Sequence, residues 1–384
     1  MLRFTQILAS LFAVGLLVSC ESTSSPFEGP PTVDVEAAPP ESLSELQLFL
    51  WDPGEGFVYN ERVVPYELNT PLFSDYALKE RAIYVPEGET MGYDGEGVFS
   101  FPVGSVIVKT FYFAPDMREP LVDRELIETR VLMHTSEGWE AWPYIWNEEQ
   151  TDAVLSPSGA TRALSFIDPQ GEPREASYLV PQRNQCSSCH VRNIGEGGEA
   201  VLTPIGPAAR HLNRDLDYGT GAENQLAHFL DVGILNALPA MTPAAFDFRR
   251  IEADGVDAIP AAEVDFAARS YLDANCAHCH SPEGTAGVTS QLFLNHDNED
   301  DFRLGVCKRP GSAGGGTFGR TYDLVPGDPE DSILYLRVET EEVGAMMPQL
   351  GRSVEHTMGS ALLYRWIAEM EPVDCGPMMP PPGG

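Results

Sequence analysis

Basic residues are scarce in this chain. Its 384 residues include 24 Lys and Arg against 58 Asp and Glu, which gives a formal net charge of -34 at pH 7. A field of that sign repels the phosphates of nucleic acids and the anionic head groups of lipids. The composition therefore argues against nucleic acid as a partner, and it favours either solubility outside the cell or a partner protein with a basic surface.

Long apolar runs are missing after the first twenty residues. The chain opens with MLRFTQILASLFAVGLLVSC, in which Arg3 precedes an apolar stretch that ends at Cys20. The stretch is short for a membrane span and has the order of an export signal. Its end, LLVSC, resembles the lipobox of bacterial lipoproteins, where cleavage precedes a cysteine that is then acylated. We expect a signal peptide over residues 1–19 and lipidation of Cys20, with an ordinary secretory signal as the alternative.

The segment after Cys20 is poor in residues that could form a core. Residues 20–44 are rich in Ser, Pro and Glu, which predicts a flexible tether, and residues 377–384 are expected to form a disordered tail. The lipid is then the only membrane anchor. Because Glu21 is not the aspartate that holds Gram-negative lipoproteins in the inner membrane, we expect an exported protein at the periplasmic face of the outer membrane or in the cell envelope.

Cysteine and histidine are few, but they are concentrated. The chain has seven Cys and eight His, and both close cysteine pairs continue directly into histidine, as CSSCH at 186–190 and CAHCH at 276–280. C-x-x-C-H is the attachment signature of c-type haem, in which each thiol adds to a vinyl group and the histidine ligates the iron. We therefore expect two covalently attached haem c groups, on Cys186, Cys189, Cys276 and Cys279, with His190 and His280 as iron ligands.

Two other readings of the cysteine pairs remain open. A zinc site would draw four ligands from both pairs and leave the histidines unexplained. A thioredoxin-like dithiol expects a strand before the pair and a helix after it, whereas a helical pattern precedes the second pair.

The C-terminal part of the chain, residues 256–376, has the pattern of an all-α cytochrome c domain that carries the second haem. A helix is predicted after Pro260, leading into the second motif, and VEHTMGSALLYRWIAEM predicts another amphipathic helix. Between them, GAMMPQLG offers Met347 as the sixth iron ligand, with Met346 as its rival. Cys307 and Cys375 remain, and an exported protein would pair them in a disulfide.

The N-terminal half of the chain has the pattern of β-strands. Over residues 45–185, β-rich runs such as SVIVKTFYF alternate with Gly, Pro and Asp, which predicts an antiparallel, sandwich-like domain. Residues 186–255 are expected to form a helical segment around the first haem. Met241 is the favoured sixth ligand there, with His211, His228 or an open site as alternatives.

The stretches NTPLFSDYALKERAIYVPEG, FPVGSVIVKTFYF, VPQRNQCSSCHVRNIG and YLDANCAHCHSPEG resemble a family of lipoprotein-like dihaem c-type cytochromes. The resemblance implies an α+β multidomain chain in which a β-rich region precedes two haem sites, and it implies electron transfer. VIVKTF followed by C-x-x-C-H also resembles cytochromes that oxidise hydroxylamine with a haem crosslinked to lysine, and Lys109 would be that lysine.

We therefore expect a membrane-anchored dihaem cytochrome that relays electrons to or from a redox partner protein. One alternative is a haem enzyme, peroxidase-like or hydroxylamine-oxidising, with an open first haem. Another is a β binding module that docks a redox partner.

Overall fold

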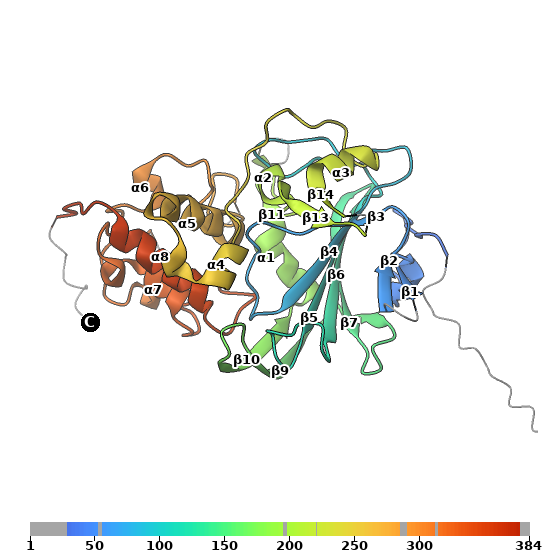
Figure 1. Ribbon diagram of the computed structural model, residues 1–384, viewed down its shortest axis with the longest axis horizontal. Coiled ribbons are helices and arrows are strands. Elements are labelled where there is room, and N and C mark those ends of the chain that lie inside the picture. Colours follow the sequence, from blue (N-terminus) through green and yellow to red (C-terminus); the bar gives the residue numbers. More distant parts are fainter. Residues whose placement is uncertain are drawn as a thin grey trace, which may run out of the picture.

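A six-stranded antiparallel sheet forms the centre of the molecule (Figure 1). The computed structural model describes residues 29–52, 56–194, 198–219, 221–284, 290–311 and 314–376, so the predicted signal peptide, Cys20 and the tail 377–384 lie outside the described residues. The strands follow one another in sequence order: β3 (Val63–Pro65), β4 (Leu78–Tyr84), β5 (Val106–Phe113), β6 (Glu125–Thr135), β7 (Gly138–Trp146) and β8 (Ala153–Leu155).

Strand β5 shows why both faces of this sheet are covered. Its alternate residues Val106 and Val108 lie in one apolar cluster, while Ile107 and Phe111 point to the other face and lie in two further clusters. Successive side chains of a strand point to opposite faces, so an apolar run of this kind needs a layer on each side. Lys109 interrupts the second face.

Different parts of the chain supply these two layers. The N-terminal strands β1 (Phe49–Asp52) and β2 (Gly56–Tyr59) and a 3-10 turn at Leu43–Leu46 lie on one side. The other side is covered at one end by helices α2 (Ala209–Leu212) and α3 (Gln225–Asp231) and at the other by the hairpin of β9 (Ala160–Ile167) and β10 (Pro173–Val180).

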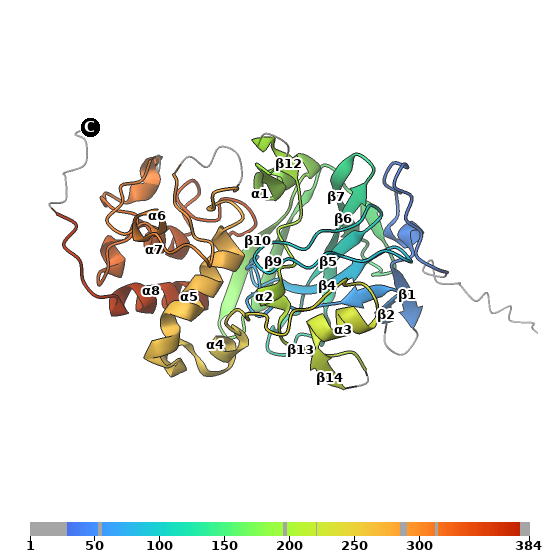
Figure 2. The same ribbon diagram turned by 90° about the horizontal axis from the view of Figure 1, so that it is seen from above.

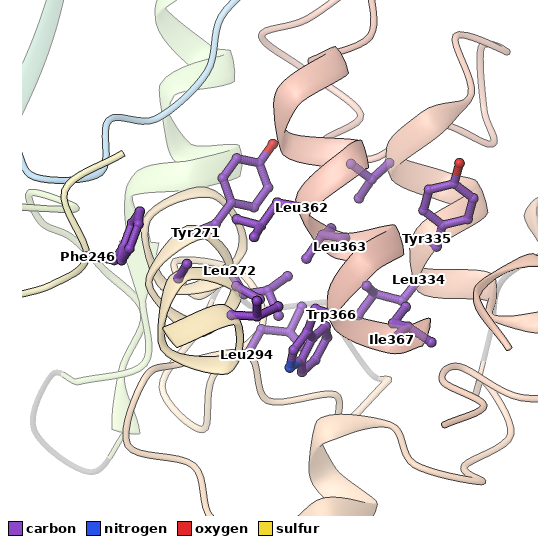
Figure 3. Packing of buried hydrophobic residues seen from close by; sticks show 14 of the residues in the cluster. Phe246, Tyr271, Leu272, Leu294, Leu334, Tyr335, Leu362, Leu363, Trp366 and Ile367 are labelled. Atoms are coloured by element: carbon purple, nitrogen blue, oxygen red, sulfur yellow. The ribbon is translucent and has the colours of Figure 1, made fainter. Parts of the chain in front are cut away.

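The C-terminal part packs around two crossing helices. Helix α5 (Ala261–Cys276) begins directly after Pro260, and α8 (Thr357–Glu369) lies against it (Figure 3). Leu272 and Leu363 are fully buried between them. The Trp366 Nε1–H donates to Asp265 Oδ1 over 2.8 Å, which satisfies the polar atom of the largest side chain in the contact.

This helical part is bound to the sheet part by buried hydrogen bonds. The backbone N–H groups of Ser353 and Val354 both donate to Asp75 Oδ1, over 2.5 and 3.0 Å, and the Phe73 N–H donates to Asn275 Oδ1 over 2.8 Å. Figures 1 and 2 both place the short helix α1 (Ser187–His190) between the sheet and the C-terminal helices. The first C-x-x-C-H motif therefore lies where the two parts meet.

The expected fold class is wrong in its helical and sandwich-like parts. Among the described residues there are five sheets, and helices account for 24% of those residues. Residues 186–255 are not simply helical, because they contain two small ladders, β11 (Val191–Arg192) with β12 (Val201–Leu202) and β13 (Asp215–Asp217) with β14 (Ala222–Asn224). No second sheet of comparable size faces the central one in the described ranges, so the β region is not a sandwich.

The C-terminal part is not an all-α cytochrome c domain either. Besides α5 and α8 it has only short helices in the ranges that the structure describes, α6 (Asp301–Leu304), α7 (Ile333–Glu339) and single 3-10 turns. Loops rich in Gly, Pro and Asp join them, and β-bridges pair Val306 with Leu324 and Tyr322 with Ser332. Helix α4 (Arg249–Asp254) and its preceding loop contribute Phe246 and Phe248 to the same core, so that core is built from both sides of the expected domain boundary.

In the part of the chain that the structure describes, no helix has both the length and the apolar character needed to cross a membrane.

Candidate functional site

The first C-x-x-C-H motif folds as one helical turn. A 3-10 turn over Arg183–Cys186 continues into α1, and Cys186 itself has helical dihedral angles, φ -57° and ψ -36°. Residues three apart on a helical turn lie on the same side. Cys186 and Cys189 are thus presented together, as attachment to the two vinyl groups of one porphyrin requires.

The second motif forms a similar turn at the end of α5. The backbone N–H groups of Cys279 and His280 both donate to the carbonyl oxygen of Cys276, over 3.1 and 2.9 Å. Burial raises the pKa of the Cys276 thiol to about 12. The helix that the sequence predicts before this motif therefore delivers the first cysteine, and the turn delivers the second cysteine and the histidine.

The two motifs are in contact with each other. Cys279 Sγ donates to the carbonyl oxygen of Ser188 over 3.6 Å, although the two residues are 91 positions apart. A hydrogen bond with Cys279 is the main cause that raises the pKa of the Cys189 thiol, with burial second. No spacing rule in the sequence predicts this contact.

Residues that follow each motif hold the contact in place. Arg192 forms an ion pair with Glu283 over 2.7 Å, and the Asn193 N–H donates to the Glu283 carbonyl over 3.1 Å. The Asn193 side-chain amide also donates to the carbonyl of Gly284 over 3.0 Å. The segments after both motifs are therefore joined by main-chain and side-chain bonds.

A cavity of about 580 Å³ opens between the sheet and the two motifs. Pockets for cofactors and small ligands are typically about 300–1,000 Å³, so the cavity has the size of a ligand site. It takes side chains from β5, β6, both motifs and α2, among them Lys109, Arg130, Cys186, His190, His211 and His278.

His190 is fixed in the form that a metal ligand needs. Its Nδ1 lies 3.0 Å from the carbonyl oxygen of Thr203, and the Thr203 N–H donates back to the His190 carbonyl over 2.7 Å. Because a carbonyl only accepts, Nδ1 carries the hydrogen and Nε2 keeps its lone pair. Burial lowers the pKa of His190 to about 4, so the ring is neutral. The residues of the first motif thus fit a haem c group bound through Cys186, Cys189 and His190 Nε2.

The second histidine is also buried and oriented. His280 Nδ1 lies 3.5 Å from Ser290 Oγ, and burial is the main cause that lowers the pKa of His280, with smaller contributions from His278 and Arg337. Arg337 also holds the predicted methionine loop, because its Nε donates to Ala345 and its carbonyl accepts from the Met347 N–H over 2.7 Å. Met347 and its rival Met346 therefore belong to a loop that Arg337 fixes, and their role as ligands stays a prediction.

The candidates for the sixth ligand of the first haem are placed very differently. The Met241 residue is 89% exposed on a loop that does not line the cavity. His228 stacks on Tyr218 and bonds to Glu223 over 2.8 Å.

His211 is the candidate that lines the cavity together with His190. His211 is buried, its Nε2 lies 2.9 Å from Asp273 Oδ2, and its Nδ1 has no hydrogen-bond partner among the residues that the structure describes. One ring nitrogen held by a carboxylate and the other free is typical of metal-bound histidine.

The structure also shows how the two cysteines outside the motifs are paired, and it bears on the zinc alternative. Cys307 and Cys375 form a disulfide with an S–S distance of 1.95 Å, the pairing expected from the sequence. Within the described residues, no three or more His, Cys, Asp or Glu side chains are grouped so that they could hold a metal ion.

Several cavity residues were missed by sequence reasoning. Arg81 and Arg130 were unremarkable strand residues, and Asp273 was one more polar position on a helix. The two arginines could be found from the strand pairing. Arg81 of β4 and Arg130 of β6 are each paired with Lys109 of β5, so all three side chains point to the same face of the sheet.

Comparison with known proteins found no matching family model, no matching curated protein and no matching solved structure.

Proposed function

We propose that this protein is an electron-relay protein that carries two covalently attached haem c groups. The observation that carries the proposal is the contact between the two C-x-x-C-H turns, where Cys279 Sγ donates to the carbonyl oxygen of Ser188 over 3.6 Å. Such contact holds the two attachment points within one small region of the protein, which suits electron exchange between two redox groups. When bound, haem c supplies reversible one-electron chemistry at iron.

The residues of the chain have separable tasks in this proposal. Cys186 and Cys189 hold one group and His190 ligates its iron, while Thr203 keeps the His190 ring in the required orientation. Cys276, Cys279 and His280 do the same for the second group. We assign His211 as the second ligand at the first site because it lines the same cavity and its ring is fixed by Asp273.

Location and partner complete the proposal. The lipobox-like LLVSC and the acidic composition support a lipid-anchored protein of the cell envelope that meets a redox partner with a basic surface. Attachment by one acyl-modified cysteine leaves the folded part free to move along the membrane surface.

Intact mass spectrometry of the protein isolated from an exporting host tests the proposal. Two haems that survive acid-acetone extraction are expected, since thioether bonds are covalent. A mass that corresponds to one haem or none contradicts it.

A second candidate is a haem enzyme with an open first site. It is favoured by the cavity beside His190 and by Lys109, which lines that cavity and whose Nζ makes no hydrogen bond within the described residues. A first haem that is high-spin at rest and binds carbon monoxide rapidly supports the enzyme, whereas a low-spin first haem supports the relay.

A further inference from the structure

Three basic side chains stand in a row across the central sheet. Arg81 of β4 is paired with Lys109 of β5, and Lys109 is paired with Arg130 of β6. Directly opposite residues point to the same face, and all three line the cavity between the sheet and the motifs. Like charges in that arrangement repel one another, so the row carries a cost unless something compensates it.

Among the described residues, a carboxylate pairs with one of these three cations, Arg130. Glu128, which is fully buried, accepts from Arg130 through both carboxylate oxygens, over 2.6 and 2.9 Å, and also accepts from the Tyr178 hydroxyl over 2.6 Å. This carboxylate is therefore already engaged with two donors and offers little to the neighbouring cations.

Arg81 and Lys109 have no such partner in the part of the chain that the structure describes. Arg81, 7% exposed, donates only to the carbonyl of Lys79, over 3.3 Å. Lys109 Nζ makes no hydrogen bond or ion pair there and lies 5.0 Å from the ring centre of Phe111. An unpaired buried charge is expensive, and such groups are normally satisfied by a ligand or a counter-ion.

The pKa shifts of Lys109 and Arg81 also favour a negative group in the cavity. Burial lowers the pKa of Lys109 well below its ordinary value, and Arg81 and Arg130 lower it further. Burial also lowers the pKa of Arg81. A negative group in the cavity would oppose both shifts, because it stabilises the charged forms of the two side chains. In a chain with a net charge of -34, a positive row of this kind is a local exception.

We propose that Arg81, Lys109 and Arg130 form a binding site for a carboxylate or another oxyanion inside this cavity. Arginine offers a planar pair of donors to such a group and lysine a point charge. The negative group has two possible sources with the same chemistry. One source is a propionate of the haem attached at Cys186 and Cys189, and this source rests on the proposed function. The other is a small free oxyanion.

The test uses the full-length protein as isolated, with Lys109→Gln and Arg81→Gln as variants. Arg124→Gln is the matched control, because Arg124 lies directly before β6, pairs with Glu80 over 2.6 Å and is not among the residues that line the cavity. The haem content of each protein is counted first by mass spectrometry, which separates failure of the proposed function from failure of the anion site.

Two readouts distinguish the sources. For a free oxyanion, inorganic phosphate or acetate should raise the melting temperature relative to chloride at equal ionic strength, and both cavity variants should lose this shift while Arg124→Gln keeps it. For a propionate, no such shift is expected. Instead the potential of the first haem should fall in both cavity variants, since cations near the haem favour the ferrous state, and Lys109→Arg should restore it.

The proposal is overturned if neither readout separates the cavity variants from Arg124→Gln. Should Arg81→Gln fail to fold, Lys109→Gln decides alone, because Lys109 Nζ has no hydrogen bond to lose in the described ranges of the chain. If the protein carries no haem, the melting experiment decides alone, and an unchanged melting temperature in both anions refutes the site.

Discussion

Cys279 Sγ of the second C-x-x-C-H motif donates to the carbonyl oxygen of Ser188 in the first motif over 3.6 Å, although the two residues are 91 positions apart. The two motifs therefore form one structural region at the junction of the sheet and the C-terminal helices. That junction is also where the cavity with its three cations lies.

The first prediction concerns the independence of the two attachment sites. Cys186→Ala with Cys189→Ala should remove one haem, and Cys276→Ala with Cys279→Ala should remove the other, because each pair serves one porphyrin. Intact mass spectrometry counts the haems that remain. Retention of two haems by either double variant would show that its motif is not an attachment site.

The disulfide supplies a matched cysteine control for this experiment. Cys307→Ala with Cys375→Ala removes a bridge between residues 68 positions apart and should lower the free energy of unfolding by about 2–5 kcal/mol. Both haems should remain, since neither residue belongs to a motif. Haem loss in this variant would mean that general instability, not lost attachment, explains the result.

The second prediction concerns His211. His211→Ala should convert a low-spin first haem to a high-spin haem that binds carbon monoxide, because the ligand that faces the His190 cavity is gone. Resonance Raman spectra report the spin state. His228→Ala is the control, since His228 is occupied by Glu223 and Tyr218. A change of spin state with Met241→Ala instead would move the ligand to the exposed loop.

The third prediction concerns the second haem. Met347→Ala should abolish the weak sulfur-to-iron band at the red end of the ferric spectrum and lower the potential of that haem, because a thioether favours ferrous iron. Potentiometric titration followed by absorption measures both. Met241→Ala, which removes an exposed methionine, should leave the band unchanged. If Met346→Ala removes the band and Met347→Ala does not, Met346 is the ligand.

The fourth prediction concerns the anchor. Cys20→Ser should release the protein from membranes with both haems retained, since LLVSC lies far from the motifs in sequence. Fractionation followed by haem staining measures the distribution. Finding the unaltered protein entirely in the soluble fraction would refute lipid anchoring.

The local features of the site could be predicted from sequence because they depend on few neighbouring residues. Pro260 marks where α5 begins, and the helix delivers Cys276 into its turn. The nearly continuous apolar run in SVIVKTFYF favours a strand, and β5 is a strand that is buried on both faces. Each of these features needs only backbone geometry and the order of side chains within about ten residues.

The errors in fold class have an equally local cause. Two amphipathic patterns around α5 and α8 suggested an all-α domain, but the residues between them carry no strong periodicity, and they form loops, short helices and isolated bridges. The ladders in residues 186–255 have two or three residues per strand, which is too short for an alternation to register.

By itself, the sequence determined the two C-x-x-C-H motifs, the cysteine pair left for a disulfide and the acidic balance, because attachment chemistry and net charge depend on residue identity alone. Only the tertiary structure decided that the motifs touch, that His211 shares the His190 cavity and that Arg81, Lys109 and Arg130 stand in register. These relationships join residues far apart in the chain. Strand register and the packing of α5 against the sheet part set them, and neither is encoded in any single stretch of sequence.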